Sequence, residues 1–404
     1  MSRRRRRVTR KNASATIISL VIVFVLGIIY LITGMDPSGI LKTADTALPE
    51  VATLVNPPPA GATPSNLTVQ PPVSGGWWEV YFTDPLNVKD SAQWQNSIEG
   101  RLIEKINAAK TSIHVASFEF DLTPVAEALI AAKQRGVDVR WVTDNEYGLE
   151  ADLEPGHGQF AMLGQRGIEV RSDSRSALMH NKFWIFDGQT VWTGSTNVTV
   201  SGIFQQNNNV VVIHSSEVAA IYEREFTEMW EGQYGPKSSS TADQQSTVVN
   251  GTPVQVYFSA EDDVMNRIIP IVRGAQSSIR FLAFSFTDQA LAQAMIDRAG
   301  TGVNAAGVFE KVGSETESAQ LRALYCAKLP VRQDGNPRFL HDKLIIVDNR
   351  YVITGSFNFS ENATESNDEN VLIIDNPQIA SLYMQEFERI WNIATEPNPA
   401  TFSC

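Results

Sequence analysis

Apolar residues recur with two different periods along residues 77–395, and the order of these periods is repeated. Short continuous apolar runs favour buried strands, and longer segments with apolar residues three and four positions apart favour amphipathic helices. The expected strands are 79–83, 112–118, 137–143, 255–259, 278–284 and 303–309. The expected helices are 94–110, 125–134, 217–230, 264–275, 291–299 and 378–391. Because strands alternate with helices, we expect an α/β fold with mixed or parallel sheets.

The repeated order indicates an internal duplication. The two opening strands read E-V-Y-F-T and Q-V-Y-F-S, and both closing helices end in F-x-x-x-W, where Phe226 and Trp230 match Phe387 and Trp391. Each Phe lies one helical turn from its Trp, so both pairs are expected in the core. We predict one pseudo-dimer made of a first half at 77–235, a linker rich in Ser, Thr and Gln at 236–251, a second half at 252–395 and a tail at 396–404.

The start of the chain has a different character. Residues 1–12 carry a cluster of Arg and Lys, and residues 13–34 form an apolar stretch without a charged side chain. A helix of this length spans a bilayer, and the basic cluster is expected to stay in the cytoplasm, with the body on the other side. A cleaved signal peptide is the alternative, which would give a secreted protein. Residues 35–76 are rich in Pro, Gly, Ala and Thr, which predicts an extended or disordered linker.

Charge and cysteine content limit the possible partners. The formal net charge is −12, and removing the seven positive charges of the first eleven residues leaves −19 for the remainder. An acidic body is repelled by long polyanions, which argues modestly against nucleic acid. The two cysteines, Cys326 and Cys404, lack the C-x-x-C spacing of a zinc or redox site, and they can form one disulfide if the body is exported.

Two stretches carry the same polar residues at the same spacing. The first contains H-x-K-x4-D and then G-S-x-N, formed by His180, Lys182, Asp187, Gly194, Ser195 and Asn197. The second contains His341, Lys343, Asp348, Gly355, Ser356 and Asn358. Each residue of the second stretch lies the same number of positions after its counterpart as His341 lies after His180. This constant offset is hard to attribute to chance.

This duplicated pattern resembles the phospholipase D superfamily, in which two H-x-K-x4-D motifs meet in one active site. The resemblance covers about residues 77–395 and implies two α/β/α halves around a pseudo-twofold axis. It also implies that Asp187 and Asp348, although part of the catalytic motifs, have a structural role. Cardiolipin synthases usually continue D-x-R-S after G-S-x-N, whereas Asn197 is followed here by V-T-V-S-G and Asn358 by F-S-E-N-A. That departure is more similar to the small bacterial endonucleases and the mitochondrial cardiolipin hydrolase type.

The motif residues can perform phosphodiester chemistry. Residues i and i+2 of a strand share a face, so each motif projects a His beside a Lys. One His can attack phosphorus and form phosphohistidine, while the other protonates the departing oxygen and then deprotonates water. The phosphate oxygens are expected to be bound by the two lysines and by Ser195, Asn197, Ser356 and Asn358. Because the lysines supply positive charge and the five histidines lack metal-ligand spacing, we expect no metal or other cofactor.

The two histidines are expected to differ in role. Glu369 matches Asn208 at the same constant offset, and each can orient an imidazole. In the superfamily such acidic residues tend to support the histidine of the opposite half, so the resemblance implies that Glu369 serves His180 and Asn208 serves His341. A carboxylate stabilises the positive charge that a histidine gains on attack. His180 is then the nucleophile and His341 the general acid and base.

The motifs specify phosphodiester chemistry but not the groups on either side of phosphorus. The predicted anchor and acidic body favour a membrane phospholipid, and the sequence after G-S-x-N favours an exported nuclease. A non-catalytic binding scaffold is a third hypothesis, against which the intact motifs speak, and a transferase is a fourth. One chain carries both motifs and suffices for one active site, and the oligomeric state is left open.

Overall fold

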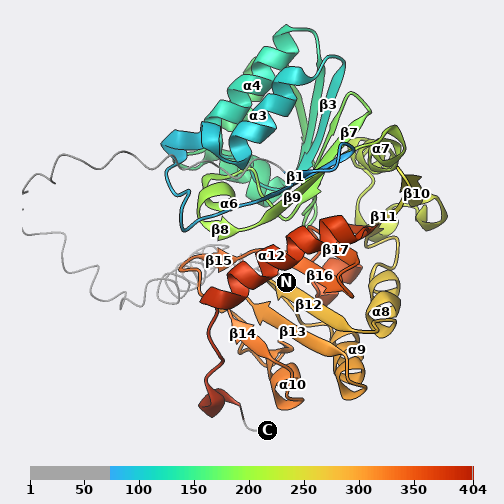
Figure 1. Ribbon diagram of the computed structural model, residues 1–404. Helices are drawn as coiled ribbons and strands as arrows, with labels where there is room; N and C mark the ends of the chain where they lie inside the picture. Colours follow the sequence, from blue (N-terminus) through green and yellow to red (C-terminus); the bar gives the residue numbers. More distant parts are fainter. Residues whose placement is uncertain (1–72, 403) are drawn as a thin grey trace, which may run out of the picture. The chain divides into compact units, whose positions relative to one another are not determined.

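The computed structural model describes residues 73–402 and residue 404. These residues form two eight-stranded sheets with helices packed on them, together with one short two-stranded ladder (Figure 1). The predicted basic tail at 1–12, the predicted anchor at 13–34 and most of the predicted linker at 35–76 lie outside the described residues. Within the described part, no helix combines the length and the apolar character that crossing a membrane requires.

The first half contains a mixed sheet in the order β1-β2-β9-β7-β6-β3-β4-β5. Strands β3, β4 and β5 are parallel, and the other neighbours are antiparallel. The strands are β1 (Val73–Ser74), β2 (Trp78–Phe82), β3 (Ser112–Ser117), β4 (Asp138–Thr143), β5 (Glu169–Ser172), β6 (Lys182–Phe186), β7 (Thr190–Gly194) and β9 (Asn209–His214).

The second half repeats this sheet in the order β10-β11-β18-β17-β16-β12-β13-β14. The parallel strands are again the last three of the order. The strands are β10 (Ser246–Val249), β11 (Thr252–Ser259), β12 (Ser278–Ala283), β13 (Asn304–Phe309), β14 (Val331–Gln333), β16 (Lys343–Val347), β17 (Tyr351–Gly355) and β18 (Glu369–Asp375).

Helices cover both faces of each sheet and define three hydrophobic clusters. One cluster lies under the outer helices of the first half, one under those of the second half, and the third joins both halves around α7 and α12. The helices are α3 (Ile98–Ala108), α4 (Thr123–Gln134), α5 (Gln159–Gln165), α6 (Val200–Phe204), α7 (Ser216–Trp230), α8 (Met265–Arg273), α9 (Gln289–Gly300), α10 (Leu321–Cys326), α11 (Glu361–Glu365) and α12 (Pro377–Ile393). Short 3-10 or π turns occupy Ser91–Asn96, Asn145–Glu150, Ala151–Leu153, Gly235–Lys237, Ala242–Gln244 and Pro399–Thr401.

The two halves are joined by matched aromatic contacts. Tyr222 of α7 meets Phe258 of β11 with ring centroids 5.4 Å apart, and Tyr383 of α12 meets Phe82 of β2 at 5.2 Å. Both pairs are edge-to-face, a favourable geometry for buried rings. Strands β8 (Gln206–Asn207) and β15 (Phe339–Leu340) add a parallel ladder between the halves. The predicted pseudo-dimer is therefore present.

The F-x-x-x-W residues of the closing helices were predicted to lie in the core, and the structure confirms this for the phenylalanines only. Phe226 and Phe387 are buried, but Trp230 and Trp391 are only partly buried against the shared core. Each indole lies under a guanidinium, with Arg171 4.0 Å from the Trp230 ring centroid and Arg332 4.1 Å from that of Trp391. The tryptophans therefore seal the edge of the core through cation–π contacts rather than filling its centre.

The linker predicted at 236–251 is partly regular structure. It contains β10, which forms an antiparallel hairpin with β11. Asn250 and Gly251 connect the strands with positive φ angles of 47° and 82°. An Asn-Gly pair favours this two-residue turn, so the hairpin had a signal in the sequence. The helix predicted at 94–110 is also divided, because the extended backbone and side chain of Ser97 cap α3.

Candidate active site

The two motif histidines lie two residues before β6 and β16, the central strands of the sheets. Every residue of both strands is buried. The backbone N–H of His180 donates to the carbonyl of Asp368, and that of His341 donates to the carbonyl of Asn207, both at 2.9 Å. Each acceptor belongs to the opposite half, so the backbone brings the two motifs together.

The two imidazoles have different partners at Nδ1. Nδ1 of His180 lies 2.7 Å from Oε2 of Glu369. Nδ1 of His341 lies 2.9 Å from Oδ1 of Asn208 and 3.1 Å from the carbonyl of Ser195. These are the crossed contacts that the family resemblance implied. Because acceptors occupy Nδ1 of both rings, a neutral imidazole here keeps its proton on Nδ1 and a free lone pair on Nε2.

Burial dominates the electrostatics of the site. It lowers the pKa of both His180 and His341 well below the usual range, and the ammonium groups of Lys182 and Lys343 lower both further. Burial also lowers the pKa of Lys182 to about 8 and that of Lys343 well below its usual range. The pKa of Glu369 is raised by burial to about 7, against the effect of Lys182. Since each lysine acts on both histidines, the two motifs form one site.

A phenylalanine lines each motif. The rings of Phe118 and Phe284 lie edge-on to the motif histidines, with centroids 4.8 Å apart in both halves. Each phenylalanine ring also faces an ammonium group, with Nζ of Lys182 at 5.1 Å and that of Lys343 at 4.7 Å. The same lysines donate to the carbonyl of their own histidine, at 2.8 Å and 2.6 Å respectively. The sequence placed these phenylalanines at strand ends without indicating that they contact the site.

The two G-S-x-N serines lie behind the histidines. Ser195 is fully buried, and its hydroxyl donates to Oδ1 of Asn208 at 2.8 Å. Ser356 is also fully buried, and its hydroxyl accepts from the backbone of Asn370 at 3.0 Å. The sequence predicts direct contact of both serines with phosphate oxygens; in the structure, Ser195 contacts Asn208, and a side-chain hydrogen bond from Ser356 lowers the pKa of Glu369 against the larger raising effect of burial. A hydroxyl both donates and accepts, which suits a residue that links a strand to an orienting side chain.

The two G-S-x-N asparagines present unsatisfied carbonyl oxygens. Oδ1 of Asn197 and Oδ1 of Asn358 are buried and have no hydrogen-bond partner within the described residues. Nδ2 of Asn197 donates to Glu119 at 2.9 Å, and Glu119 acts electrostatically on Lys182. Buried polar atoms without partners are uncommon, so both side chains are available to a ligand. Glu119 was not predicted as a site residue. Its counterpart in the second half is Ser285, so the duplication does not repeat the acidic residue.

The two motif aspartates hold turns rather than substrate. Asp187 follows β6 with a φ of 55°, and its carboxylate accepts from the backbone N–H groups of residues 110, 111 and 112. Asp348 has a φ of 56° and accepts in the same way from residues 276, 277 and 278. These bonds lower the pKa of both carboxyl groups, against a raising effect of burial. The structural role implied by the resemblance agrees with this geometry.

The motif glycines are required by close backbone approach. Gly194 and Gly355 have φ angles of 149° and 140°. A Cβ at either position would lie 2.2 Å from a carbonyl oxygen, that of Asn209 or of Asn370. Only glycine avoids this overlap, and the resulting contact places the neighbouring serine against the next strand.

Asn209 and Asn370 anchor a buried polar network that crosses between the halves. Asn209 bonds to Asp342, Thr354 and Tyr383 of the second half. Asn370 bonds to Asn181, Thr193 and Tyr222 of the first half. Both asparagines keep the constant offset of the motifs, so the signal was present in the sequence although we did not use it. A satisfied buried network fixes one relative placement of the packed elements.

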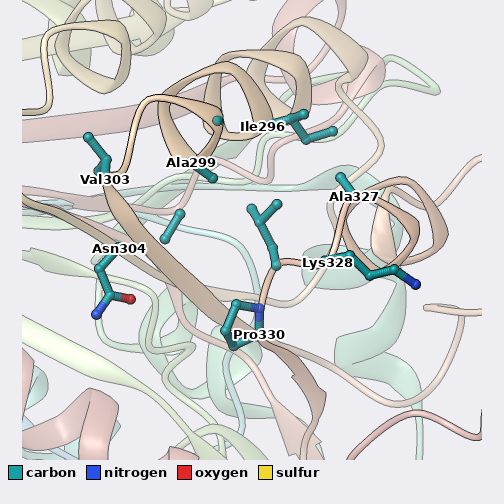
Figure 2. A pocket seen from close by; sticks show the side chains of 10 residues that line it. Ile296, Ala299, Val303, Asn304, Ala327, Lys328 and Pro330 are labelled. Atoms are coloured by element: carbon teal, nitrogen blue, oxygen red, sulfur yellow. The ribbon is translucent and has the colours of Figure 1, made fainter.

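Neither the candidate metal-ligand group nor the pocket described here contains a histidine. Among residues 73–402 and 404, the side chains close enough to share a metal ion are Glu225, Glu228 and Glu261, and no histidine belongs to this group. A pocket of about 360 Å³ lies between α9, β13 and the segment before β14. Figure 2 shows that its lining is mostly apolar, with Asn304 and Lys328 as the polar side chains labelled. It contains no acid or histidine and does not coincide with the motifs.

Comparison with known proteins gives matches in both halves. The family model described as "Cardiolipin synthase, PLD-like domain" matches residues 102–230 and 268–391, and each range contains one motif. A mitochondrial cardiolipin hydrolase from Xenopus laevis is 34% identical over 141 residues, which are 35% of this chain and 64% of that protein. A phospholipase D from Rickettsia bellii is 34% identical over 134 residues, 33% of this chain and 67% of that protein. The chain thus spans just under two thirds of the Xenopus relative.

The solved structures agree at the level of the fold. The phosphatidylserine synthase of Haemophilus influenzae is 17% identical, with a TM-score of 0.55, and the match covers 78% of this chain and 85% of that one. At this identity the likeness concerns the fold alone. The duplicated motifs, their meeting in one site and the family match over both halves lead to one conclusion: the chain belongs to the phospholipase D superfamily, in the PLD-like domain family.

Proposed function

We propose that this protein is a metal-independent phosphodiesterase that hydrolyses phospholipids through a phosphohistidine intermediate. The observation that carries the proposal is the unequal support of the two imidazoles, with Glu369 at Nδ1 of His180 and Asn208 at Nδ1 of His341. A carboxylate stabilises the charge that develops on an attacking imidazole, whereas an amide accepts a hydrogen bond without adding negative charge. This assigns His180 as nucleophile and His341 as general acid and base.

The first step transfers the phosphoryl group to the enzyme. The phosphate anion lies between Lys182 and Lys343, and it counters the ammonium charges that lower the pKa of His341. His341 can therefore carry a proton on Nε2 in the complex. The lone pair of Nε2 of His180 attacks phosphorus, the bond to the leaving oxygen breaks, and His341 gives that oxygen its proton.

The second step returns the enzyme to its starting state. His341, now neutral, removes a proton from water, and the water oxygen attacks phosphorus. The bond between phosphorus and Nε2 of His180 breaks, and the phosphate product leaves. Phosphorus is inverted in each of the two steps, so its configuration is retained overall. The lysines hold the equatorial oxygens in both steps and supply the positive charge that a metal supplies in other phosphodiesterases.

Exposed apolar side chains beside the site support a lipid substrate. Leu153 is 87% exposed and Val312 is 69% exposed. Leu153 follows Tyr147, whose ring lies 5.0 Å from that of Phe118 in the site. Val312 follows Glu310, whose carboxylate accepts from the N–H of the residue before His341. Each half thus exposes one large apolar side chain within six residues of a residue that contacts the surroundings of its motif, and exposed apolar side chains favour contact with a membrane.

A nucleic-acid phosphodiesterase is the second candidate. The sequence after G-S-x-N favours it, because it is more similar to the small bacterial endonucleases than to cardiolipin synthases. Against it stands the net charge of −19 for the chain after its basic start, which repels a long polyanion. The predicted anchor at 13–34 would also keep the body beside a membrane, where lipid is abundant.

The experiment that tests the proposal is one assay panel in chelator. The full chain is given vesicles of phosphatidylcholine, vesicles containing cardiolipin, single-stranded DNA and a soluble bis-aryl phosphodiester. We expect turnover of the soluble diester and of one vesicle type. Leu153→Asp combined with Val312→Asp should reduce vesicle turnover and leave the soluble diester unaffected. Cleavage of DNA with no vesicle turnover would show that the substrate is a nucleic acid rather than a lipid. Loss of all turnover in chelator, measured well below Tm, would contradict the proposal that the reaction needs no metal.

A further inference from the structure

An acidic cluster is formed by side chains from both halves. Glu225 and Glu228 extend from α7 of the first half, and Glu261 follows β11 of the second half. One carboxylate oxygen of each lies within 4.8 Å of the others. Three negative charges this close repel one another strongly unless protons or a cation are shared among them.

The central carboxylate of this cluster has no partner. Glu225 is 4% exposed, and among residues 73–402 and 404 its carboxylate meets the charges of other acidic side chains and accepts no hydrogen bond. Burial raises the pKa of Glu225 well above its usual range, and Glu261 raises it further. Glu228 accepts from the hydroxyl of Ser238, and no described ion pair involves any of the three glutamates. A buried carboxylate without a partner is costly, so it points to a ligand that satisfies it.

The second half shows what occupies the equivalent place. Glu386 matches Glu225, and Arg389 matches Glu228, at the same constant offset that relates the two motifs. The guanidinium of Arg389 donates to both oxygens of Glu386, at 2.6 Å and 2.8 Å. It also lies 3.9 Å from Asp84, which follows β2 as Glu261 follows β11. At the pseudosymmetric position, therefore, a cation binds carboxylates from both halves.

The neighbouring acidic residues are already satisfied and do not complete the cluster. Asp368 bonds to Arg175 and to the backbone N–H of Gly235. Asp262 accepts from Ser240, Gln245 and the backbone N–H of Phe258. Both nevertheless raise the pKa of Glu225, so they add negative potential at the cluster. The three glutamates remain as available oxygen ligands from two halves of the chain.

We propose that Glu225, Glu228 and Glu261 bind a calcium ion that fastens the two halves together. An all-carboxylate set suits a hard cation, and calcium accepts the irregular geometry of ligands on a helix and a loop better than magnesium does. Zinc prefers nitrogen and sulfur ligands, which the cluster lacks. The ion touches no motif histidine and takes no part in phosphoryl transfer.

The test measures thermal stability of the full chain rather than activity, so its outcome is separate from that of the proposed function. The protein is stripped with chelator, dialysed and melted near pH 8 with calcium, magnesium or no divalent ion. We expect calcium to raise Tm saturably by about 3 °C or more and magnesium to raise it less. An unchanged Tm in millimolar calcium would overturn the proposal and would mean that the cluster shares protons instead.

Two variants make the assignment specific. Glu228→Arg reproduces the Glu386–Arg389 pair of the second half, so its metal-free Tm should exceed that of the stripped wild type and should no longer respond to calcium. Glu127→Arg makes the same charge change at an exposed position of α4 and should keep the calcium response. If Glu228→Arg fails to fold, Glu225→Gln provides the same readout. A calcium response that survives in Glu228→Arg or Glu225→Gln places the binding elsewhere and overturns the proposal.

Discussion

Glu369 and Asn208 occupy equivalent positions in the two halves, yet one is a carboxylate behind His180 and the other an amide behind His341. The histidines, the lysines and the G-S-x-N residues match in type, but Asn181 corresponds to Asp342 and Asn207 to Asp368. The site is therefore nearly symmetric in geometry and asymmetric in charge. In the proposed reaction, the symmetric geometry lets both histidines reach one phosphate, and the asymmetric charge favours a different role for each of them.

The two histidines should fail in different ways. His180→Ala should abolish the covalent intermediate, because no Nε2 remains to attack. His341→Ala should still form it from a nitrophenyl phosphodiester, whose leaving group departs without a proton, and should then hydrolyse it slowly. Rapid-quench mass spectrometry locates the phosphate. Phosphate on residue 341 of the wild-type enzyme would reverse the assignment.

The pH profile should follow Glu369 and Lys182. The pKa of Glu369 is raised to about 7, so its carboxylate is lost as the pH falls through that value and His180 loses support. The pKa of Lys182 is lowered to about 8, so its charge is lost as the pH rises. We expect kcat/KM of the soluble diester to be bell-shaped between these values. Glu369→Gln should remove the acidic limb and lower kcat by roughly 100-fold or more; an acidic limb that persists would assign it to another group.

The motif aspartates should contribute to stability and only indirectly to rate. Asp187→Ala leaves three backbone N–H groups without their acceptor, which should cost about 2 kcal/mol of unfolding free energy. Asp348→Ala should behave alike. The folded pKa of each carboxyl is depressed, so the contribution is present above its unfolded pKa near 4 and is lost as the pH falls through the folded value. Urea titrations of variant and wild type near pH 7 and about pH 3 measure this; an equal difference at both would contradict it.

The disulfide should stabilise the second half. Cys326 and Cys404 are bonded, with Cα atoms 5.4 Å apart and a sequence separation of 78. Closing a loop of this length restricts the unfolded chain, which stabilises the fold by at most about 4 kcal/mol. Cys404→Ser should lower Tm, and a reductant should lower Tm of the wild type but not of the variant. Such a bond persists in oxidising compartments, so we propose that the body is exported. Export can be checked by adding protease to intact cells. Protection of the body from cleavage would contradict export.

The sequence predicted what the duplication repeats and missed what depends on side-chain direction. Two halves, two mixed sheets and the crossed pairing of Glu369 with His180 followed from the constant offset and the family resemblance. The Phe118 ring was not assigned to the site, because an aromatic residue at a strand end has the same pattern whether it faces the core or a ligand. Ser195 was expected to contact phosphate, but the close approach of Gly194 to Asn209 directs it inward. The Asn250–Gly251 pair predicts a hairpin turn, whereas the polar residues before it favour a linker over the strand β10 that the structure contains.

The hydrogen bond between His180 and Glu369 joins residues 189 positions apart in the chain. Contacts of such long range form late in folding, because the loop between them must close before any contact compensates the lost entropy. The first half can complete its own sheet during synthesis while its histidine still lacks the carboxylate that supports it. Under the proposed function, an emerging chain is therefore inactive until the second half has folded onto the first. The onset of catalytic activity thus reports the last step of folding. The delay between the appearance of secondary structure and the onset of activity measures the time that docking of the halves takes.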